Sequence, residues 1–108
     1  MIQEVTVIDA LRAHAVIEQI IDSEKLIHIA TAFKLARLSN DLTLLGETTQ
    51  SLLAGAGAKA EDSVDFVDKV LGNIVEIDTY GLTVADLEKE ELLEISIPDA
   101  SAIIKLLG

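Results

Sequence analysis

The stretch LARLSNDLTLLGETTQSLL, residues 35–53, decides the fold that the sequence predicts. Its apolar residues recur at alternating spacings of three and four, which is the heptad-like pattern of one helix face. We call this row the leucine seam; its members are Leu35, Leu38, Leu42, Leu45, Thr49 and Leu52. From Leu26 to about Ala54 there is no proline and only one glycine, Gly46. The pattern therefore predicts one helix of about 28 residues, roughly 42 Å long.

The segment before the seam predicts a second, antiparallel helix. Thr6 is followed three residues later by Asp9, an N-cap pattern that starts a helix ending at about Asp22. Residues 2–5 are a candidate short strand, and residues 23–25 carry a start signal for the long helix. A short connection between two helices gives a helical hairpin.

The C-terminal third predicts shorter elements. A helix is expected over residues 63–71, with an Asp65–Lys69 pair one turn apart, followed by a strand over residues 74–80. Thr83 and Asp86 repeat the N-cap pattern, residues 94–97 are a second strand candidate, and Pro98 begins a last helix to residue 107. The expected fold is a single domain, 1–108, mainly α (α+β): a long helical hairpin with a two- or three-stranded β layer and short C-terminal helices.

Gly55-Ala56-Gly57 raises the question of a phosphate-binding loop. Such a loop follows a buried strand and opens a helix, whereas these glycines follow a long helix and lack the Lys-Ser/Thr of a nucleotide-binding loop. We expect Gly55 to end the long helix in a left-handed conformation. No nucleotide is expected to bind there.

The composition favours association with other proteins. The chain has 37 Leu, Ile and Val residues, which is more aliphatic surface than a small monomer easily hides. The net charge is −11, with 4 basic and 7 acidic residues in 1–54 and 4 basic and 12 acidic residues in 55–108. Without a basic cluster, direct nucleic-acid binding is not expected. No signal peptide or apolar run of about 20 residues is evident, so a soluble protein without a membrane partner is expected.

Candidate catalytic and metal-binding residues are few. The chain has no cysteine, which excludes thiolate chemistry and Cys-ligated zinc. His14, Glu18 and Asp22 share one helix face, but the interpretation we favour is a solvated face rather than a metal site. His28 is expected to pack or to cap a helix. Ser39, Thr48 and Ser51 lack a nucleophile motif. No catalytic residue, cofactor or metal is predicted.

An acidic run lies near the C-terminus and consists of Asp86, Glu88, Glu90, Glu91 and Glu94. A solvated helix face is the simpler interpretation of such a run. Spaced carboxylates can also imitate a row of phosphates and occupy a basic nucleic-acid site on another protein. Together with the leucine seam, this run is the predicted interaction surface.

Three segments resemble a known family: AFKLARLSNDL in the long helix, EIDTYGLTVADL, and ISIPDASAIIKLL at the end. They are similar to a widespread set of small tailed-phage proteins of uncharacterised function. Residues 33–37 fit that family's pattern, residues 97–100 fit it loosely, and the AGAG connection departs from it. The resemblance implies a phage origin, and no catalytic residues carry over. It implies a location in the host cytoplasm or in the virion.

Three hypotheses follow. The leading one is a non-enzymatic phage protein that acts by protein–protein association, as a homo-oligomer or with phage structural proteins, in the virion or in its assembly. The second is an anti-defence inhibitor that presents the acidic run to a host protein. The third is an oligomeric ligand-binding sponge or enzyme with a site between subunits.

Overall fold

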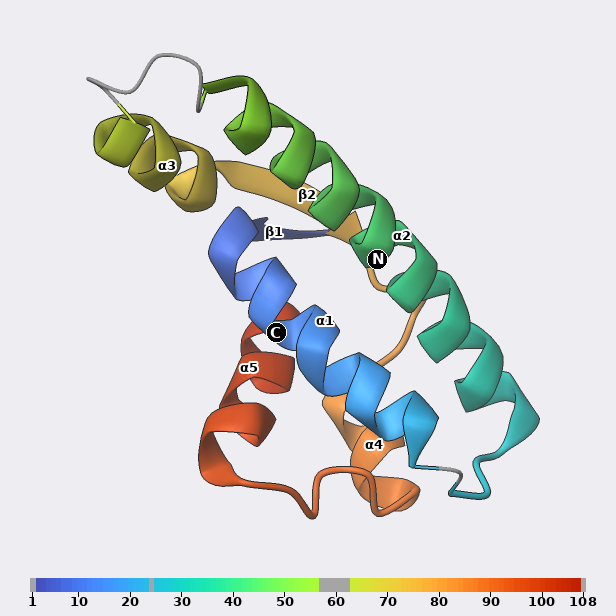
Figure 1. The fold of residues 1–108 in the computed structure, drawn as a ribbon. Helices are drawn as coiled ribbons and strands as arrows, with labels where there is room; N and C mark the ends of the chain where they lie inside the picture. Colours follow the sequence, from blue (N-terminus) through green and yellow to red (C-terminus); the bar gives the residue numbers. More distant parts are fainter. Residues whose placement is uncertain (1, 24, 57–62, 108) are drawn as a thin grey trace.

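The computed structural model describes residues 2–23, 25–56 and 63–107. Its elements in chain order are β1 (Ile2–Thr6), α1 (Val7–Asp22), α2 (Ile29–Ala56), α3 (Ser63–Gly72), β2 (Ile74–Asp78), α4 (Val84–Lys89) and α5 (Ile97–Leu107). The molecule measures 48 × 25 × 22 Å, and α2 runs along its long axis (Figure 1). The mainly α (α+β) fold class is therefore confirmed, with one small sheet and several helices.

The sheet has two strands that are far apart in the sequence. β1 and β2 pair antiparallel, with Ile2 opposite Asp78 and Thr6 opposite Ile74. The predicted strand at residues 94–97 is wrong, because this segment is irregular up to Ser96 and α5 begins at Ile97. The N-terminal strand supplies the partner of β2 instead, so the sheet joins the start of the chain to its C-terminal third.

Helix α1 lies at the centre of the molecule, between α2 and α5 (Figure 1). Thr6 caps it, since the Thr6 hydroxyl accepts a hydrogen bond from the Asp9 amide at 3.3 Å. Ala10 and Ala13 are fully buried and have short side chains, which allow neighbouring elements to approach closely. The rest of the core consists of aliphatic residues from both helices of the hairpin, β1, β2 and the C-terminal segments. Because α1 packs against both α2 and α5, its buried residues lie at the centre of the core.

The start of the long helix differs from the prediction. Ser23 does not begin it but caps the end of α1, where its amide and hydroxyl both donate to the Ile20 carbonyl. Helix α2 begins at Ile29, and His28 caps it by accepting the Ala30 amide at Nδ1, 3.3 Å away. A serine can cap the end of one helix or the start of the next, and the sequence pattern alone does not separate the two cases. This explains why the predicted start of α2 lies before the observed one.

The glycine prediction is also wrong. Gly55 lies inside α2, which continues to Ala56, and the left-handed glycine among the described residues is Gly81, with φ 76°. Gly57 lies outside the described residues, as does the Asp65 side chain of the predicted Asp65–Lys69 pair. Gly46 faces Leu11 of α1, whose Cδ2 would lie 3.6 Å from an added Cβ. Gly46 therefore marks a close contact between α2 and α1.

Candidate functional site

Most of the leucine seam lies inside the protein. Leu35, Leu38 and Leu42 are essentially inaccessible to solvent, Leu45 is half-buried, and only Leu52 is largely exposed, at 51%. The first three pack in the core beneath α1 and are not available to a partner. Only the C-terminal end of the predicted interaction surface is therefore free for binding.

Leu52 borders an apolar groove of about 360 Å³ between the C-terminal half of α2, α3 and β2. Its wall includes Leu45, Val70 and Val75. Among the described residues that line it none is acidic, and Lys69 carries a charge. The whole chain has a net charge of −11, so most of its surface repels another acidic protein. This groove repels such a protein less.

The acidic run is divided between structural and exposed roles. Asp86 completes a capping box at α4, because its carboxylate accepts the Thr83 amide at 3.0 Å while its own amide donates to the Thr83 hydroxyl. The hydrogen bond from the Thr83 amide favours the ionised form and lowers the pKa of Asp86. Lys34 of α2 lies 3.9 Å away and adds a partly exposed ion pair. Asp86 is therefore used by the fold.

Two further contacts join the acidic run to the start of α2. The Lys25 ammonium donates to the Glu91 carbonyl oxygen at 2.7 Å, and the His28 amide donates to Glu90 Oε2 at 3.1 Å. Together with the Lys34–Asp86 pair, they hold two segments side by side that are about sixty residues apart in sequence. Glu88, Glu91 and Glu94 keep exposed side chains.

The segment around the start of α2, which these contacts hold beside the acidic run, carries three exposed apolar side chains. Leu26 is 98% exposed, Ile29 69% and Phe33 62%. Ile29 and Phe33 lie one turn apart on an exposed face of α2. We call this surface the apolar–acidic corner; it consists of Leu26, Ile29, Phe33, Glu88, Glu90 and Glu91.

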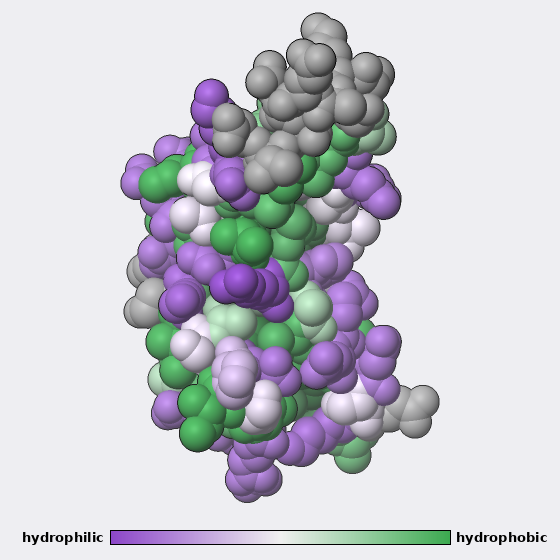
Figure 2. All heavy atoms as spheres, turned by 60° about the vertical axis from the view of Figure 1, so that its left-hand side comes forward, coloured by the Kyte–Doolittle hydropathy of each residue, from purple (hydrophilic) through white to green (hydrophobic). Residues whose placement is uncertain are grey.

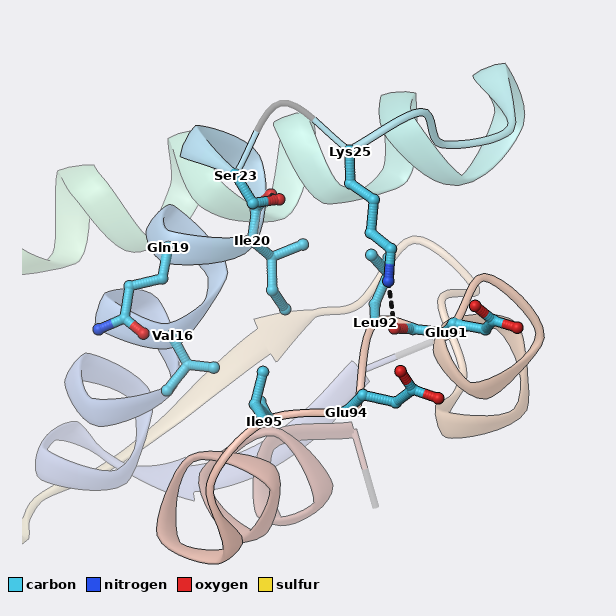
Figure 3. A pocket seen from close by; sticks show the side chains of 9 residues that line it. All are labelled: Val16, Gln19, Ile20, Ser23, Lys25, Glu91, Leu92, Glu94 and Ile95. Atoms are coloured by element: carbon cyan, nitrogen blue, oxygen red, sulfur yellow. Dashed lines mark hydrogen bonds between the residues drawn. The ribbon is translucent and has the colours of Figure 1, made fainter.

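A small groove adjoins the corner (Figure 3). It has a volume of about 280 Å³ and lies between the end of α1, Lys25 and the segment from Glu91 to Ile95. Val16, Ile20, Leu92 and Ile95 supply its apolar side chains, and Lys25, Glu91 and Glu94 stand around them (Figure 3). A groove of this kind suits one apolar side chain with a basic end.

The predicted helix face of His14 and Glu18 is not simply solvated, because it meets two hydroxyls of α2. The Ser39 hydroxyl donates to Glu18 Oε1 at 2.6 Å, and His14 Nε2 lies 3.1 Å from both Glu18 Oε1 and the Thr43 hydroxyl. Asp22 has no part in these contacts. The hydrogen bond from Ser39 is the main cause that lowers the pKa of Glu18; burial opposes it, and the hydrogen bond and charge of His14 lower the pKa further. The network links α1 to α2.

This network contains the residue types of a hydrolase triad but not its geometry. Nucleophilic catalysis requires a hydroxyl that gives its proton to a base, usually a histidine held by a carboxylate. Here Ser39 donates to the carboxylate itself, and Thr43 donates to the Ser39 carbonyl at 2.9 Å. Among the described residues, no three His, Asp or Glu side chains form a group that could hold a metal ion.

No protein-family model, curated protein or solved structure matches the chain. No helix in the described ranges is both long and apolar enough to cross a bilayer. The candidate site therefore depends on the geometry alone.

Proposed function

We propose that the protein acts by binding another protein through the apolar–acidic corner. The observation that carries this proposal is the set of three contacts that hold the acidic run beside the start of α2, the segment in which Ile29 and Phe33 are exposed. Large apolar side chains outside the core are a feature of interaction surfaces. The expected partner presents apolar side chains surrounded by Lys or Arg.

The adjoining groove strengthens the proposal. Interfaces concentrate their binding energy on a few side chains that enter pockets near the centre. The groove beside Lys25 and Glu94 has the size for such an anchor (Figure 3). An Arg or Lys of the partner would place its methylenes against Val16 and Ile95 and its charge near Glu94.

The resemblance to small tailed-phage proteins supplies the proposed setting. The partner would be a phage structural protein, and the chain would serve as a small virion component or assembly factor without catalytic activity. Mass spectrometry of purified virions separates the two roles. A virion component is present in fixed proportion, whereas an assembly factor is found only in infected cells.

The binding surface itself is tested by affinity capture from infected cells, with quantification by mass spectrometry. Phe33→Asp places a charge at the centre of the corner, and we expect it to remove the partner. Ile104→Asp makes the same kind of change at an exposed position on α5 and serves as the matched control. Equal capture by Phe33→Asp and the native chain would contradict the proposal. A host nuclease or polymerase as the captured protein would favour the anti-defence hypothesis instead.

A further inference from the structure

Strand β2 has one edge that no described strand covers, since the sheet contains β1 and β2 alone within the described ranges. The Val7 amide donates to the Asn73 carbonyl at 2.9 Å, which fixes the hydrogen-bonding phase of the antiparallel ladder. In that phase Val75 and Ile77 face β1, so the amide and carbonyl groups of Ile74 and Glu76 point away from it. Neither residue's outward backbone groups have a partner among the described residues.

A groove of about 420 Å³ follows this edge between β2 and α2. Its lining consists of Asp41, Leu44, Leu45, Val75, Glu76, Ile77 and Asp78. Successive residues of a strand point to opposite faces, so four consecutive lining residues place the groove along the strand edge rather than on one face. Leu44 is 56% exposed beside it. The edge therefore combines unpaired backbone groups with apolar side chains.

The described charged side chains that line this groove, and the Glu4–Glu76 pair on the exposed face of the sheet, are acidic. Glu4 of β1 lies directly opposite Glu76, and both are exposed. Like charges that lie opposite each other destabilise two paired strands. The two facing glutamates therefore do not contribute to the stability of the sheet. Asp41 and Asp78 also line the groove, and its described lining residues include no Lys or Arg. A strand added here would continue the row that begins with Glu4 and Glu76.

We propose that an extended segment of a partner protein, with alternating basic and apolar side chains, pairs with the free edge of β2. Main-chain hydrogen bonds to Ile74 and Glu76 would supply affinity, as in other cases of strand addition to an open sheet. A basic side chain would stand next to Glu76. The intervening apolar side chains would point to the opposite face, towards Leu45 and Val75.

A second copy of this chain suits the edge poorly. A two-fold pairing of β2 with β2 that used the whole strand would be centred on Glu76. It would set Glu4 and Glu76 of both copies in one row of four carboxylates. The charge pattern therefore selects a basic segment over self-pairing.

The test uses a ten-residue peptide that alternates Lys with Val or Thr, and a second peptide of the same composition without alternation. Binding is followed by backbone amide chemical shifts and hydrogen exchange of the full chain. We expect the alternating peptide to protect the Ile74 and Glu76 amides and to bind at least about tenfold more tightly than the rearranged one, because only it can form the ladder.

Variants locate the contact. Glu76→Pro removes an outward amide without removing a hydrogen bond to β1, because proline is tolerated at a strand edge. Glu76→Lys reverses the charge. Both should weaken the alternating peptide at least about tenfold, whereas Glu88→Lys, the same charge change on α4, should alter its affinity less than about threefold. If Glu76→Pro fails to fold, the affinity of Glu76→Lys and the amide protection in the native chain still test whether the peptide binds at β2.

Three outcomes would overturn the proposal. The rearranged peptide could bind as tightly, Glu88→Lys could weaken binding as much as Glu76→Lys, or the shifts could fall on residues 86–94 rather than on β2. Protection of the Glu76 amide in a dimer without peptide would also overturn it, because a second copy would then occupy the edge. Shifts on residues 86–94 would place the peptide on the apolar–acidic corner, so protection of the Ile74 and Glu76 amides separates this proposal from the proposed function.

Discussion

Tyr80 and Gly81 form the turn from β2 towards α4, and both have left-handed backbone, with φ of 55° and 76°. The Leu82 amide donates to the Thr79 carbonyl at 2.9 Å and closes the turn. The Tyr80 amide donates to Asp78 Oδ1 at 2.8 Å, and this hydrogen bond lowers the pKa of Asp78. The turn thus ends the strand two residues earlier than the sequence pattern predicted.

The Tyr80 side chain holds this unfavourable backbone in place. Its hydroxyl donates to Asp41 of α2, and this hydrogen bond, which only the neutral hydroxyl can donate, raises the pKa of Tyr80. The Arg37 guanidinium lies 5.8 Å from the ring centroid. Contacts with α2 therefore compensate for a left-handed conformation that costs a tyrosine about 1 kcal/mol or more.

Two glycine substitutions should change stability in opposite directions. Gly81→Ala should lower the free energy of unfolding by about 1 kcal/mol, because alanine is strained at a φ of 76°. Gly55→Ala should leave it unchanged or raise it by up to about 1 kcal/mol, because Gly55 is helical and an added Cβ meets no atom within 4 Å. Denaturant unfolding measures both. A loss of stability in Gly55→Ala would contradict the helical assignment.

The network of Glu18, Ser39 and His14 should make stability depend on acid. The folded pKa of Glu18 lies below its ordinary value of 4.5, so its contribution is present above that pH and is lost as the pH falls through the folded pKa. Ser39→Ala removes the first cause of the shift. We expect it to cost about 1 kcal/mol near pH 7 and to flatten the decline in unfolding free energy below about pH 5.

The control for this network is Ser101→Ala on α5, where the serine is exposed. It should leave the pH profile parallel to that of the native chain. Asp78 and Asp86 also have lowered pKa values, so part of the acid sensitivity should persist in Ser39→Ala. Parallel profiles for Ser39→Ala and the native chain would show that the hydrogen bond to Glu18 does not contribute.

At the scale of elements, the leucine seam divides into a structural part and a free part. Leu42 is fully buried between α2 and the rest of the core, whereas Leu52, ten residues on, is half-exposed beside the α3 groove. The seam continues past the start of α1, so Leu52 lies beside α3 and its groove rather than against α1. The same spacing of apolar residues therefore continues from a buried part of α2 into an exposed part.

Truncation at the two ends of the seam should separate these roles. Leu42→Ala should lower the free energy of unfolding by about 2–5 kcal/mol, because it leaves a cavity in the core. Leu52→Ala should cost less than about 1 kcal/mol, because its side chain already meets solvent. Thermal or denaturant unfolding at low protein concentration makes the comparison. Equal losses would mean that Leu52 is as well packed as Leu42.

At the scale of the whole molecule, the aliphatic excess seen in the composition is only partly placed in the core. Large apolar side chains that remain exposed include Ile2, Ile21, Leu26, Ile29, Phe33, Leu44, Leu52, Phe66, Ile74, Ile97 and Ile104. Figure 2 shows apolar surface between hydrophilic patches on one such face. The distribution leaves several surfaces with apolar side chains rather than a single large patch.

Self-association is expected at the groove beside Leu52, since the lining residues that the structure describes are apolar or uncharged apart from Lys69. Light scattering at high micromolar concentration should give a mass above the 11.6 kDa of one chain. Leu52→Asp should return it to the monomer, because it places like charges in the contact, while Ile104→Asp should not. A mass of 11.6 kDa for the native chain at every concentration would contradict this prediction.

The sequence by itself determined the elements whose signals are local. The spacing of the leucine seam predicted α2, and the pairs Thr6–Asp9 and Thr83–Asp86 predicted where α1 and α4 begin. Helix periodicity and N-caps depend on residues within about four positions of each other, so they can be read without the fold.

Only the tertiary structure decided which elements meet. It paired β1 with β2, left residues 94–96 without a strand partner and brought the acidic run beside the start of α2. It also turned His14 and Glu18 towards hydroxyls of α2. Strand pairing and interhelical hydrogen bonds join residues distant in sequence, and their free energy depends on how the whole core packs. No local pattern records that choice.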